Sequence, residues 1–393
     1  MKLLYITPLW SGLKPFFYNA SEENSGMPAF FKVFSNILND PKVSLIYVTL
    51  FVYGSQEEIN IPNKFKGKIK IQKVFITGRL SLYLRMIQVI FSSIILVKKE
   101  KINIIYSHGT ISFLGGIVGI ISGVKHYRRI YGTFLYKKVL AKRNVFFSNF
   151  FEYLNFKLPS DGIIMTNDGT SGDKVFRYIN KENNSNFHFL INGVDKSRKV
   201  MDKFKSFPLK ERYFTYIARI DSWKRQHLLI EILADLNKEG IDFPHTYIVG
   251  QIYDVKYNEE IENLILDNFL SSKITIVGPV SSKEVKYLLK NSYLSFSFYD
   301  YSNLGNVFLE GLALGTAMMA INEYNSLDKV PENSYISITT ANKNEIKTKL
   351  KNLLNNPLFH SQIKQNALNF SQNNLSDWDT RILKEKQIIL QQE

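Results

Sequence analysis

The 393-residue chain contains no cysteine. This absence excludes disulfide scaffolds, thiolate zinc sites and cysteine nucleophiles, and it fits a reducing compartment. Long apolar runs are missing as well. The longest, near residues 86–97 and 113–124, span about a dozen residues, whereas a membrane-spanning helix needs about 20. Pro8 interrupts the first apolar run and no small-residue cleavage site follows, which favours a buried strand over a signal peptide.

Acidic residues are scarce in the first half of the chain. Residues 1–195 contain 25 Lys+Arg and 12 Asp+Glu, a net charge of +13 out of the total of +15. Two basic clusters contribute to this charge: Lys64, Lys66, Lys68, Lys70 and Lys73, and then Arg128, Arg129, Lys137, Lys138, Lys142 and Arg143. The excess indicates either a solvated lysine surface or a domain that faces phospholipid, a pyrophosphate-linked substrate or nucleic acid.

Apolar, β-rich runs alternate with helical patterns along the whole chain, which predicts βα units and parallel sheets. The expected strands are residues 2–7, 43–49, 69–75, 102–106, 127–131, 162–166, 187–191, 213–218, 246–249, 274–277, 294–298 and 317–321. The expected helices are residues 28–38, 80–99, 112–121, 170–178, 226–236, 259–269, 283–289, 304–314 and 345–354, with a helical tail from 357 to 391.

A polar segment at residues 196–210 divides this pattern and is typical of a linker. We therefore predict an α/β protein of two Rossmann-like domains that face each other across a cleft. The predicted domains are residues 1–195 and 196–360, followed by the helical tail.

Ligands of parallel α/β sheets bind beyond the carboxyl ends of the strands, near helix N-termini. Arg219 and Lys224 lie on the loop that leaves one predicted strand. A forked guanidinium and an ammonium at this spacing can clamp a diphosphate, although surface loops often carry two cations.

Two further strand ends carry candidate binding residues. Gly278-Pro279-Val280 offers a wall for a flat base, and Asn303-Leu304-Gly305-Asn306 precedes a predicted helix. Glycine there allows a ligand close to the backbone amides, and the helix dipole favours an anion. Glu310, among apolar neighbours, could accept hydrogen bonds from a vicinal diol; the alternative is a solvated helix carboxylate.

These residues carry a resemblance to a known family. Arg219 and Lys224, the Gly278 turn, Glu310 and the sequence from Gly311 to Thr316 resemble the donor domain of retaining, nucleotide-sugar-dependent glycosyltransferases of family 4, which have the GT-B fold and include bacterial polysaccharide enzymes. The junction Asn192-Gly193-Val194-Asp195 is similar to the one before the family's second domain. The resemblance spans nearly the whole chain and is more specific in the second half.

The chain departs from the family at one position. The family pattern has two glutamates with seven residues between them; Glu310 matches the second, and Ser302 occupies the position of the first. In relatives this first carboxylate contacts the donor sugar. The sugar, and catalysis itself, are therefore open at this position, and Asp300 is the nearby carboxylate that could partly substitute.

The resemblance implies transfer of a sugar from a UDP- or GDP-linked donor to a glycan or lipid-linked hydroxyl, with retention at the anomeric carbon. His108, Arg219 and Lys224 are implied as catalytic residues. Gly26, Val280, Asn303, Leu304, Gly305, Asn306 and Glu310 are implied as donor-binding residues. No metal, other cofactor or nucleic acid is expected. A lone histidine such as His108 can equally be structural.

In relatives the first domain binds the acceptor, so the resemblance implies that the basic first domain holds it, with the protein in the cytoplasm or attached peripherally at the inner membrane face. The resemblance also implies that the final helices, 361–393, pack back on the first domain. The helix near residues 80–99 has apolar Leu84, Met86, Ile87, Ile90, Phe91 and Ile94 flanked by basic residues. This pattern is typical of an interfacial helix and equally of a core-facing one.

Other classes remain in competition or are disfavoured. The loop after the first strand lacks the glycine spacing of a dinucleotide-binding turn, and no Walker-type loop is found. A sugar-nucleotide epimerase of the same fold stays open. So does a catalytically silent, membrane-associated protein that binds nucleotide sugar, which Ser302 keeps in consideration.

Overall fold

A computed structural model describes residues 1–22, 28–54, 58–181 and 186–391. The chain divides into two compact units. Unit 1 comprises Met1–Asn167, Ser171–Gly193 and Trp378–Glu393, and unit 2 comprises Asp168–Thr170 and Val194–Asp377. The change from one unit to the other falls two residues before the predicted boundary at 195. The short segment Asp168–Thr170, which no pattern in the sequence singled out, is part of unit 2.

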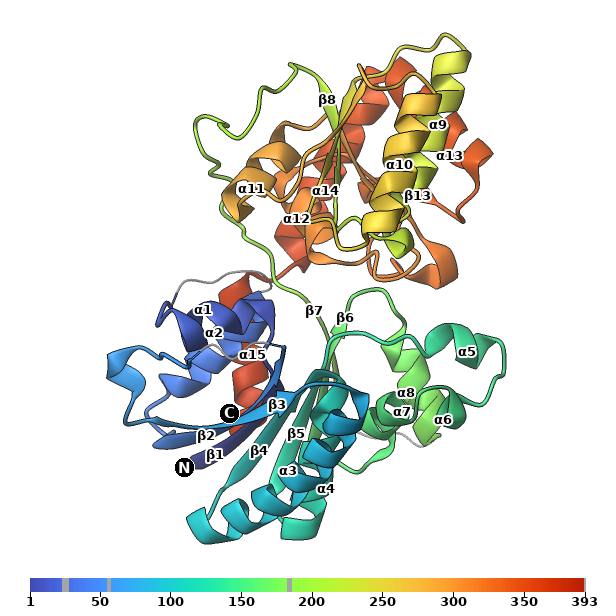
Figure 1. Cartoon of the computed structure of the whole chain (residues 1–393). Coiled ribbons are helices and arrows are strands. Elements are labelled where there is room, and N and C mark those ends of the chain that lie inside the picture. Colours follow the sequence, from blue (N-terminus) through green and yellow to red (C-terminus); the bar gives the residue numbers. More distant parts are fainter. Residues whose placement is uncertain (23–27, 55–57, 182–185, 392–393) are drawn as a thin grey trace. The chain divides into compact units, whose positions relative to one another are not determined.

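Unit 1 is built on a seven-stranded parallel sheet with the order β3-β2-β1-β4-β5-β6-β7 (Figure 1). Successive residues of β1 point to opposite faces, so Leu3 and Tyr5 pack in one core and Leu4 and Ile6 in another. The strands are β1 Lys2–Pro8, β2 Leu45–Tyr53, β3 Ile69–Ile76, β4 Ile104–His108, β5 Lys125–Ile130, β6 Gly162–Asn167 and β7 Phe187–Ile191.

Helices cover both faces of this sheet. The core that contains Leu4 and Ile6 includes α3 and α4, and the core that contains Leu3 and Tyr5 includes α2 and α15. The helices are α1 Lys14–Tyr18, α2 Pro28–Leu38, α3 Arg79–Glu100, α4 Ser112–Ser122, α5 Tyr136–Leu140, α6 Val145–Ser148, α7 Phe150–Lys157, α8 Gly172–Asn180 and α15 Trp378–Leu390, with 3₁₀ turns at Ser11–Leu13, Asn63–Phe65 and Gly109–Ile111.

Unit 2 repeats the plan with a six-stranded parallel sheet of order β10-β9-β8-β11-β12-β13. Its strands are β8 Tyr213–Ile217, β9 His245–Val249, β10 Ile274–Ile276, β11 Leu294–Ser297, β12 Met318–Ile321 and β13 Ile336–Ile338. Its helices are α9 Gln226–Lys238, α10 Val255–Asp267, α11 Ser282–Asn291, α12 Asn306–Leu314, α13 Lys343–Asn355 and α14 Pro357–Asn374, with 3₁₀ turns at Ser222–Lys224, Glu323–Asn325 and Glu332–Ser334.

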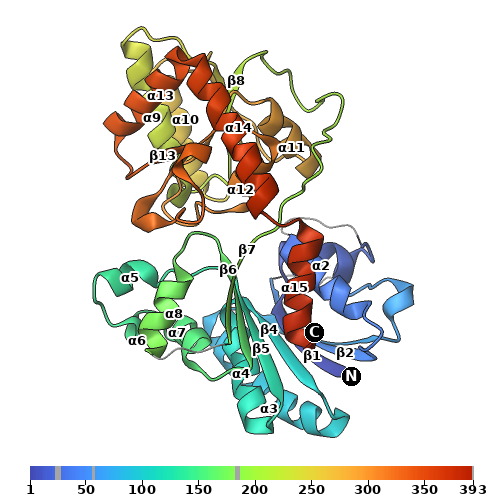
Figure 2. The same ribbon diagram turned by 180° about the vertical axis from the view of Figure 1, so that it is seen from behind.

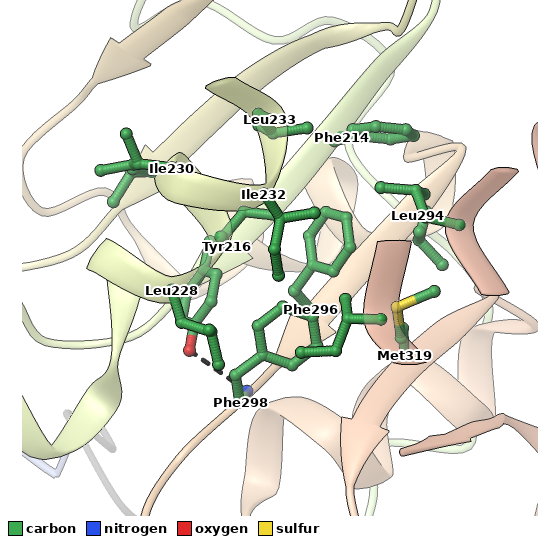
Figure 3. Packing of buried hydrophobic residues seen from close by; sticks show 14 of the residues in the cluster. Phe214, Tyr216, Leu228, Ile230, Ile232, Leu233, Leu294, Phe296, Phe298 and Met319 are labelled. Atoms are coloured by element: carbon green, nitrogen blue, oxygen red, sulfur yellow. Dashed lines mark hydrogen bonds between the residues drawn. The ribbon is translucent and has the colours of Figure 1, made fainter. Parts of the chain in front are cut away.

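Aromatic side chains of the two central strands fill the main core of unit 2. Figure 3 shows Phe214 and Tyr216 of β8 and Phe296 of β11 packed with Leu228 and Ile232 of α9. The hydroxyl of Tyr216 also accepts a hydrogen bond from the Phe298 amide (3.1 Å). This contact holds the ends of β8 and β11 together at the carboxyl edge of the sheet, from which the site residues extend.

The predicted α/β class is confirmed by these two parallel sheets. The short helices α5, α6 and α7 and strand β13 were not expected from the sequence, because none of them is long enough to show a periodic apolar pattern. The linker at 196–210 has no helix or strand, but Phe204 and Phe207 pack on the second core of unit 2.

The return of the chain to unit 1 begins later than predicted. Residues 361–377 belong to unit 2, because Ile363 of α14 is buried in its main core. Only α15 packs in unit 1, where it lies beside α2 (Figure 2).

The second predicted basic cluster is wrong in part, because Arg128 and Arg129 are fully buried. Arg128 donates to backbone carbonyls, among them Leu154 O (3.1 Å). Arg129 pairs with Glu385 of α15 (Nε–Oε1 2.8 Å). Neither guanidinium can therefore contribute to an anion-binding surface.

Candidate functional site

Of the predicted donor-binding residues, Val280 and Asn303–Asn306 follow strands at the carboxyl edge of the unit 2 sheet, and Glu310 lies on α12, which begins there. Strands β8 and β11 are neighbours there, and the strand order reverses between them, since β9 lies beyond β8 and β12 beyond β11. A crevice at such a switch point is the usual ligand site of an open parallel sheet. Two loops leave this point: 218–225 after β8 and 298–305 after β11.

Two cations occupy the loop after β8. The Lys224 ammonium lies 3.6 Å from the centre of the Tyr299 ring and 3.8 Å from that of Trp223. The Arg219 guanidinium lies 4.7 Å from the Tyr253 ring and is 47% exposed, so it is open to a ligand. Asp221 is buried between them and lies 3.5 Å from Arg219.

The electrostatics of this loop are set by burial. Burial lowers the pKa of Lys224 to about 7; the Asp221 carboxylate opposes this shift, whereas Arg219 adds to it. Burial also raises the pKa of Asp221, against the effect of the two cations. The negative charge of an incoming diphosphate would favour the ammonium form of Lys224, which burial disfavours. The loop is therefore suited to binding an anion.

Local hydrogen bonds fix the path of the loop. The Tyr216 hydroxyl donates to the carbonyl of Lys224, and the buried Gln226 amide donates to the carbonyl of Arg219 (2.7 Å). Gly250, at the end of β9, is required by close packing, because a Cβ there would lie 1.9 Å from the carbonyl oxygen of Ala218. Nothing in the sequence pattern had singled out Gly250.

Asp300 lies on the same loop as Ser302. Its side chain forms an ion pair with Arg225, and its amide donates to Trp223 O (2.8 Å). Arg225 has a positive φ of 54° and also lies 3.4 Å from Glu323. The expectation that Asp300 could partly substitute for the missing glutamate stays a prediction; in this structure its carboxylate is paired with Arg225.

A different carboxylate meets Ser302. Asp168, from the segment 168–170, accepts a hydrogen bond from the Ser302 hydroxyl (2.7 Å) and another from the Thr170 hydroxyl (2.7 Å). Its backbone carbonyl accepts from the Leu304 amide (3.0 Å). Burial raises the pKa of Asp168, partly offset by these hydrogen bonds, and its negative charge raises the pKa of Lys224. Asp168 is thus an acidic group of the site that sequence reasoning missed.

The residues between β11 and α12 have separate roles. The Asn303 side chain is fully engaged: it accepts from the Tyr299 amide (3.0 Å) and donates to the Tyr299 carbonyl (2.7 Å). The Leu304 amide is committed to Asp168. Gly305 caps α12 and Asn306 begins it, so the positive end of the helix dipole, which favours an anion, lies there.

Glu310 lies on α12 in a second group of charges. Burial raises its pKa to about 7; the Asp195 carboxylate adds to the shift and Lys286 opposes it. Lys286 and Asp195 form an ion pair of 2.6 Å. Glu310 is half-buried, which excludes the simple solvated carboxylate. Val280, partly buried, packs in the second core of unit 2, and Gly278 has open space where its Cβ would be.

His108 ends β4 in unit 1, next to β1, where the order of that sheet also reverses. Its Nδ1 lies 2.8 Å from the Tyr131 hydroxyl. Within the described part of the chain, Nε2 has no hydrogen-bond partner. Burial lowers the pKa of His108 to about 3, so the imidazole is neutral near pH 7. Gly26, the remaining predicted donor-binding residue, lies outside the described residues.

No metal site is evident in the described ranges 1–22, 28–54, 58–181 and 186–391: they contain no group of three or more His, Asp or Glu side chains arranged to hold an ion. The expectation of metal-independent chemistry stays a prediction.

Comparison with known structures identifies the fold of this chain. The two parallel sheets with their covering helices define the GT-B fold of glycosyltransferases. HepE from Anabaena, solved in complex with UDP, covers 100% of both chains with a TM-score of 0.68 at 13% identity. Sucrose-phosphate synthase from Thermosynechococcus elongatus covers 100% of this chain and 98% of its own with a TM-score of 0.70 at 16% identity.

Sequence comparison points to the same group. Residues 197–370 match the family model of glycosyl transferases group 1, so the match covers the greater part of unit 2. The capsular polysaccharide biosynthesis glycosyltransferase CapH of Staphylococcus aureus is 24% identical over 214 residues, which are 52% of this chain. The chain spans 56% of the length of that relative.

Proposed function

We propose that the chain is a group 1 glycosyltransferase that moves a sugar from a nucleoside-diphosphate donor to a hydroxyl of a growing polysaccharide or its lipid-linked precursor. One observation carries this proposal: Arg219, Lys224 and the N-terminus of α12 lie on the two loops of a switch point, within the segment that matches the family. HepE was solved with UDP and with UDP-glucose, which supports a uridine donor as the first to test.

The chemistry follows from the charges. As the bond between the anomeric carbon and the diphosphate oxygen breaks, its electron pair moves to the diphosphate. Arg219, Lys224 and the positive end of the α12 dipole would stabilise that charge. For a retaining reaction, the acceptor oxygen bonds to the anomeric carbon on the side the diphosphate leaves, and the acceptor proton passes to a phosphate oxygen. No protein nucleophile is required.

The other residues would orient the donor. Glu310 would accept hydrogen bonds from the ribose hydroxyls, and Asp168, joined to Ser302, would supply the carboxylate that the family pattern has at position 302. Neutral His108 would accept or donate a hydrogen bond to the sugar rather than transfer a proton. We propose a cytoplasmic reaction without a required metal.

The test is transfer from radiolabelled UDP- and GDP-sugars to lipid-linked glycan extracts. Arg219→Ala and Lys224→Ala should each lower turnover about 10²-fold or more, as for loss of one preorganised charge-stabilising donor. Lys238→Ala, at the exposed end of α9, is the matched control and should leave turnover unchanged. Near-normal transfer by both site variants would refute the assignment.

The same assay separates the rival functions. Conversion of the sugar nucleotide without any acceptor would indicate an epimerase. Tight binding of the donor with no turnover on any extract would indicate the silent binding protein that Ser302 had suggested.

A further inference from the structure

Helix α3 exposes an apolar stripe. Leu80, Leu84, Ile87, Phe91 and Ile95 follow one another at spacings of three or four residues, which places them on one side of the helix. They are 55–72% exposed. Isolated exposed apolar residues are common, but a continuous row along a 22-residue helix is not.

The other side of α3 is already used in packing. Met86, Val89, Ser93 and Val97 are buried, and α3 packs against β3 and α4. Of the residues expected from the sequence to form an interfacial face, Met86 is therefore a core residue. The helix is long and apolar enough to cross a membrane by length and composition. Because one side belongs to the core of unit 1, it can meet a bilayer only with the exposed stripe.

The apolar surface continues onto α6 and α7. The Tyr83 ring of α3 lies 5.7 Å from that of Phe151, which lies 5.7 Å from Phe150. Phe150 in turn lies 5.1 Å from Phe146. The neighbouring Phe147 is 82% exposed. A row of contacting rings thus extends the α3 stripe to a strongly exposed aromatic side chain.

The surroundings are almost free of negative charge. Residues 59–160 contain 18 Lys+Arg and 2 Asp+Glu. Without the buried Arg128 and Arg129, the net charge of this stretch is 16 − 2 = +14. Both carboxylates are engaged: Glu100 lies 3.5 Å from Lys2, and buried Glu152 accepts from the Thr133 hydroxyl (2.6 Å). Exposed basic residues stand at both ends of the stripe, with Arg79 before it and Lys98, Lys99 and Lys101 after it.

We propose that the α3 stripe and the α6–α7 rings form a docking surface for an anionic phospholipid bilayer. α3 lies in the plane of the interface, its apolar side chains enter the acyl boundary, and the lysines and arginines at its ends contact headgroup phosphates. The combination of an apolar stripe with one sign of charge favours a lipid surface over a second copy of this chain, which would bring like charges together.

The experiment is flotation of the full-length protein with vesicles of phosphatidylcholine alone or with 30% phosphatidylglycerol. We expect binding to the anionic vesicles only, reduced about 10-fold or more when salt is raised to 1 M, where the Debye length is ~3 Å. The double variant Ile87→Glu/Phe91→Glu should lose binding. Val255→Glu/Leu266→Glu, which adds the same charge to the exposed side of α10 in unit 2, is the control and should bind normally.

Several results would overturn the proposal. They are absence of wild-type binding, equal binding to neutral vesicles, or binding that survives the α3 double variant. A stripe-dependent dimer in sedimentation without vesicle binding would assign the surface to a second copy, and resistance to carbonate extraction would indicate insertion across the bilayer. Unchanged thermal midpoints should accompany the variants, and Lys98→Gln/Lys99→Gln tests the charge without touching the apolar stripe. No donor or acceptor is involved, so failure here leaves the proposed transferase activity untouched.

Discussion

Lys224 is held between two aromatic rings with a pKa of about 7. Below pH 7 the free protein therefore carries the ammonium that a diphosphate needs. Above pH 7 binding must first restore a proton, so affinity should fall by up to about 10-fold per pH unit. Glu310, with its raised pKa of about 7, becomes a carboxylate over the same range and would favour a diol as pH rises.

The two effects can be separated by calorimetric titration with a nucleotide sugar, whose diphosphate diester does not titrate near neutrality. In an E310Q background, affinity should decrease from pH 6.5 to pH 8.5. Adding Lys224→Arg should remove that slope, because a guanidinium stays charged throughout. A slope that persists in the arginine variant would show that another group titrates.

Substitution of Asp168 gives a second prediction about the pH dependence of donor binding. Asp168→Asn keeps the shape of the side chain but removes a charge that raises the pKa of Lys224. The pH at which donor affinity declines should therefore move down, and turnover should fall about 10- to 100-fold, as for loss of a hydrogen bond to a charged group.

Ser302→Ala is the comparison variant for Asp168. It removes one hydrogen bond to the carboxylate and leaves the charge, so the pH profile should stay in place. If both variants shift the profile equally, the charge of Asp168 is not what matters.

The residues of the site differ in how far sequence could predict them. Arg219 and Lys224 follow one strand closely, so a local pattern located them. Asp168 is 134 residues from Ser302, and no local pattern links such positions. Asn303 and Leu304 stay predicted donor-binding residues; the hydrogen bonds of the Asn303 side chain to Tyr299 and of the Leu304 amide to Asp168 could not be read from the sequence.

At the scale of elements, α15 is fixed to unit 1 by a buried ionic network. Glu385 pairs with Arg129 (2.8 Å) and with Arg381 (2.8 Å), and it accepts from the Tyr106 hydroxyl. Arg381 also donates to Ile191 O (3.0 Å). Burial raises the pKa of Glu385, but Arg129 and Arg381 outweigh this effect and hold it at about 2.

Glu385→Gln should therefore lower the free energy of unfolding of unit 1 by ~3–5 kcal/mol near pH 7, since two buried guanidiniums lose their partner. The native carboxyl has a depressed pKa, so its contribution is complete above the ordinary value near 4.3 and disappears as pH falls toward 2. The difference between wild type and variant should shrink over that window.

Urea unfolding followed by tryptophan fluorescence can measure this. Trp10 and Trp378 lie in unit 1 and Trp223 in unit 2, so a Trp223→Phe background reports on unit 1. Glu239→Gln, which removes an exposed pair with Lys347, is the control and should change stability little. Equal effects of the two substitutions on the free energy of unfolding would mean that the buried network stabilises unit 1 no more than an exposed ion pair does.

The helical tail also shows a limit of prediction from sequence patterns. Composition predicted helix across 357–391, and α14 and α15 are helices. The division between them follows from what each buries: Ile363 enters the core of unit 2, and Ile382 and Ile389 enter that of unit 1. Because the two amphipathic stretches have similar composition, the sequence does not indicate which unit each one packs in.

At the scale of the whole molecule, alternation of strands and helices was enough to predict two parallel α/β units, because buried parallel strands form continuous apolar runs. The excess of positive charge lies in the first half of the chain, in the stretch that contains α3. Which basic residues reach the surface could not be read from sequence, as the burial of Arg128 and Arg129 shows.

The placement of α15 in unit 1 affects how the protein is made. The seven strands of that unit leave the ribosome long before residues 378–390. The core that contains Leu3, Tyr5 and Ile164 also contains Trp378 and Ile382, so it stays incomplete, covered only in part by α2, while the rest of unit 2 is synthesised. Unit 2 can complete its own core first. Unit 1, whose strands are synthesised first, therefore completes its folding after unit 2.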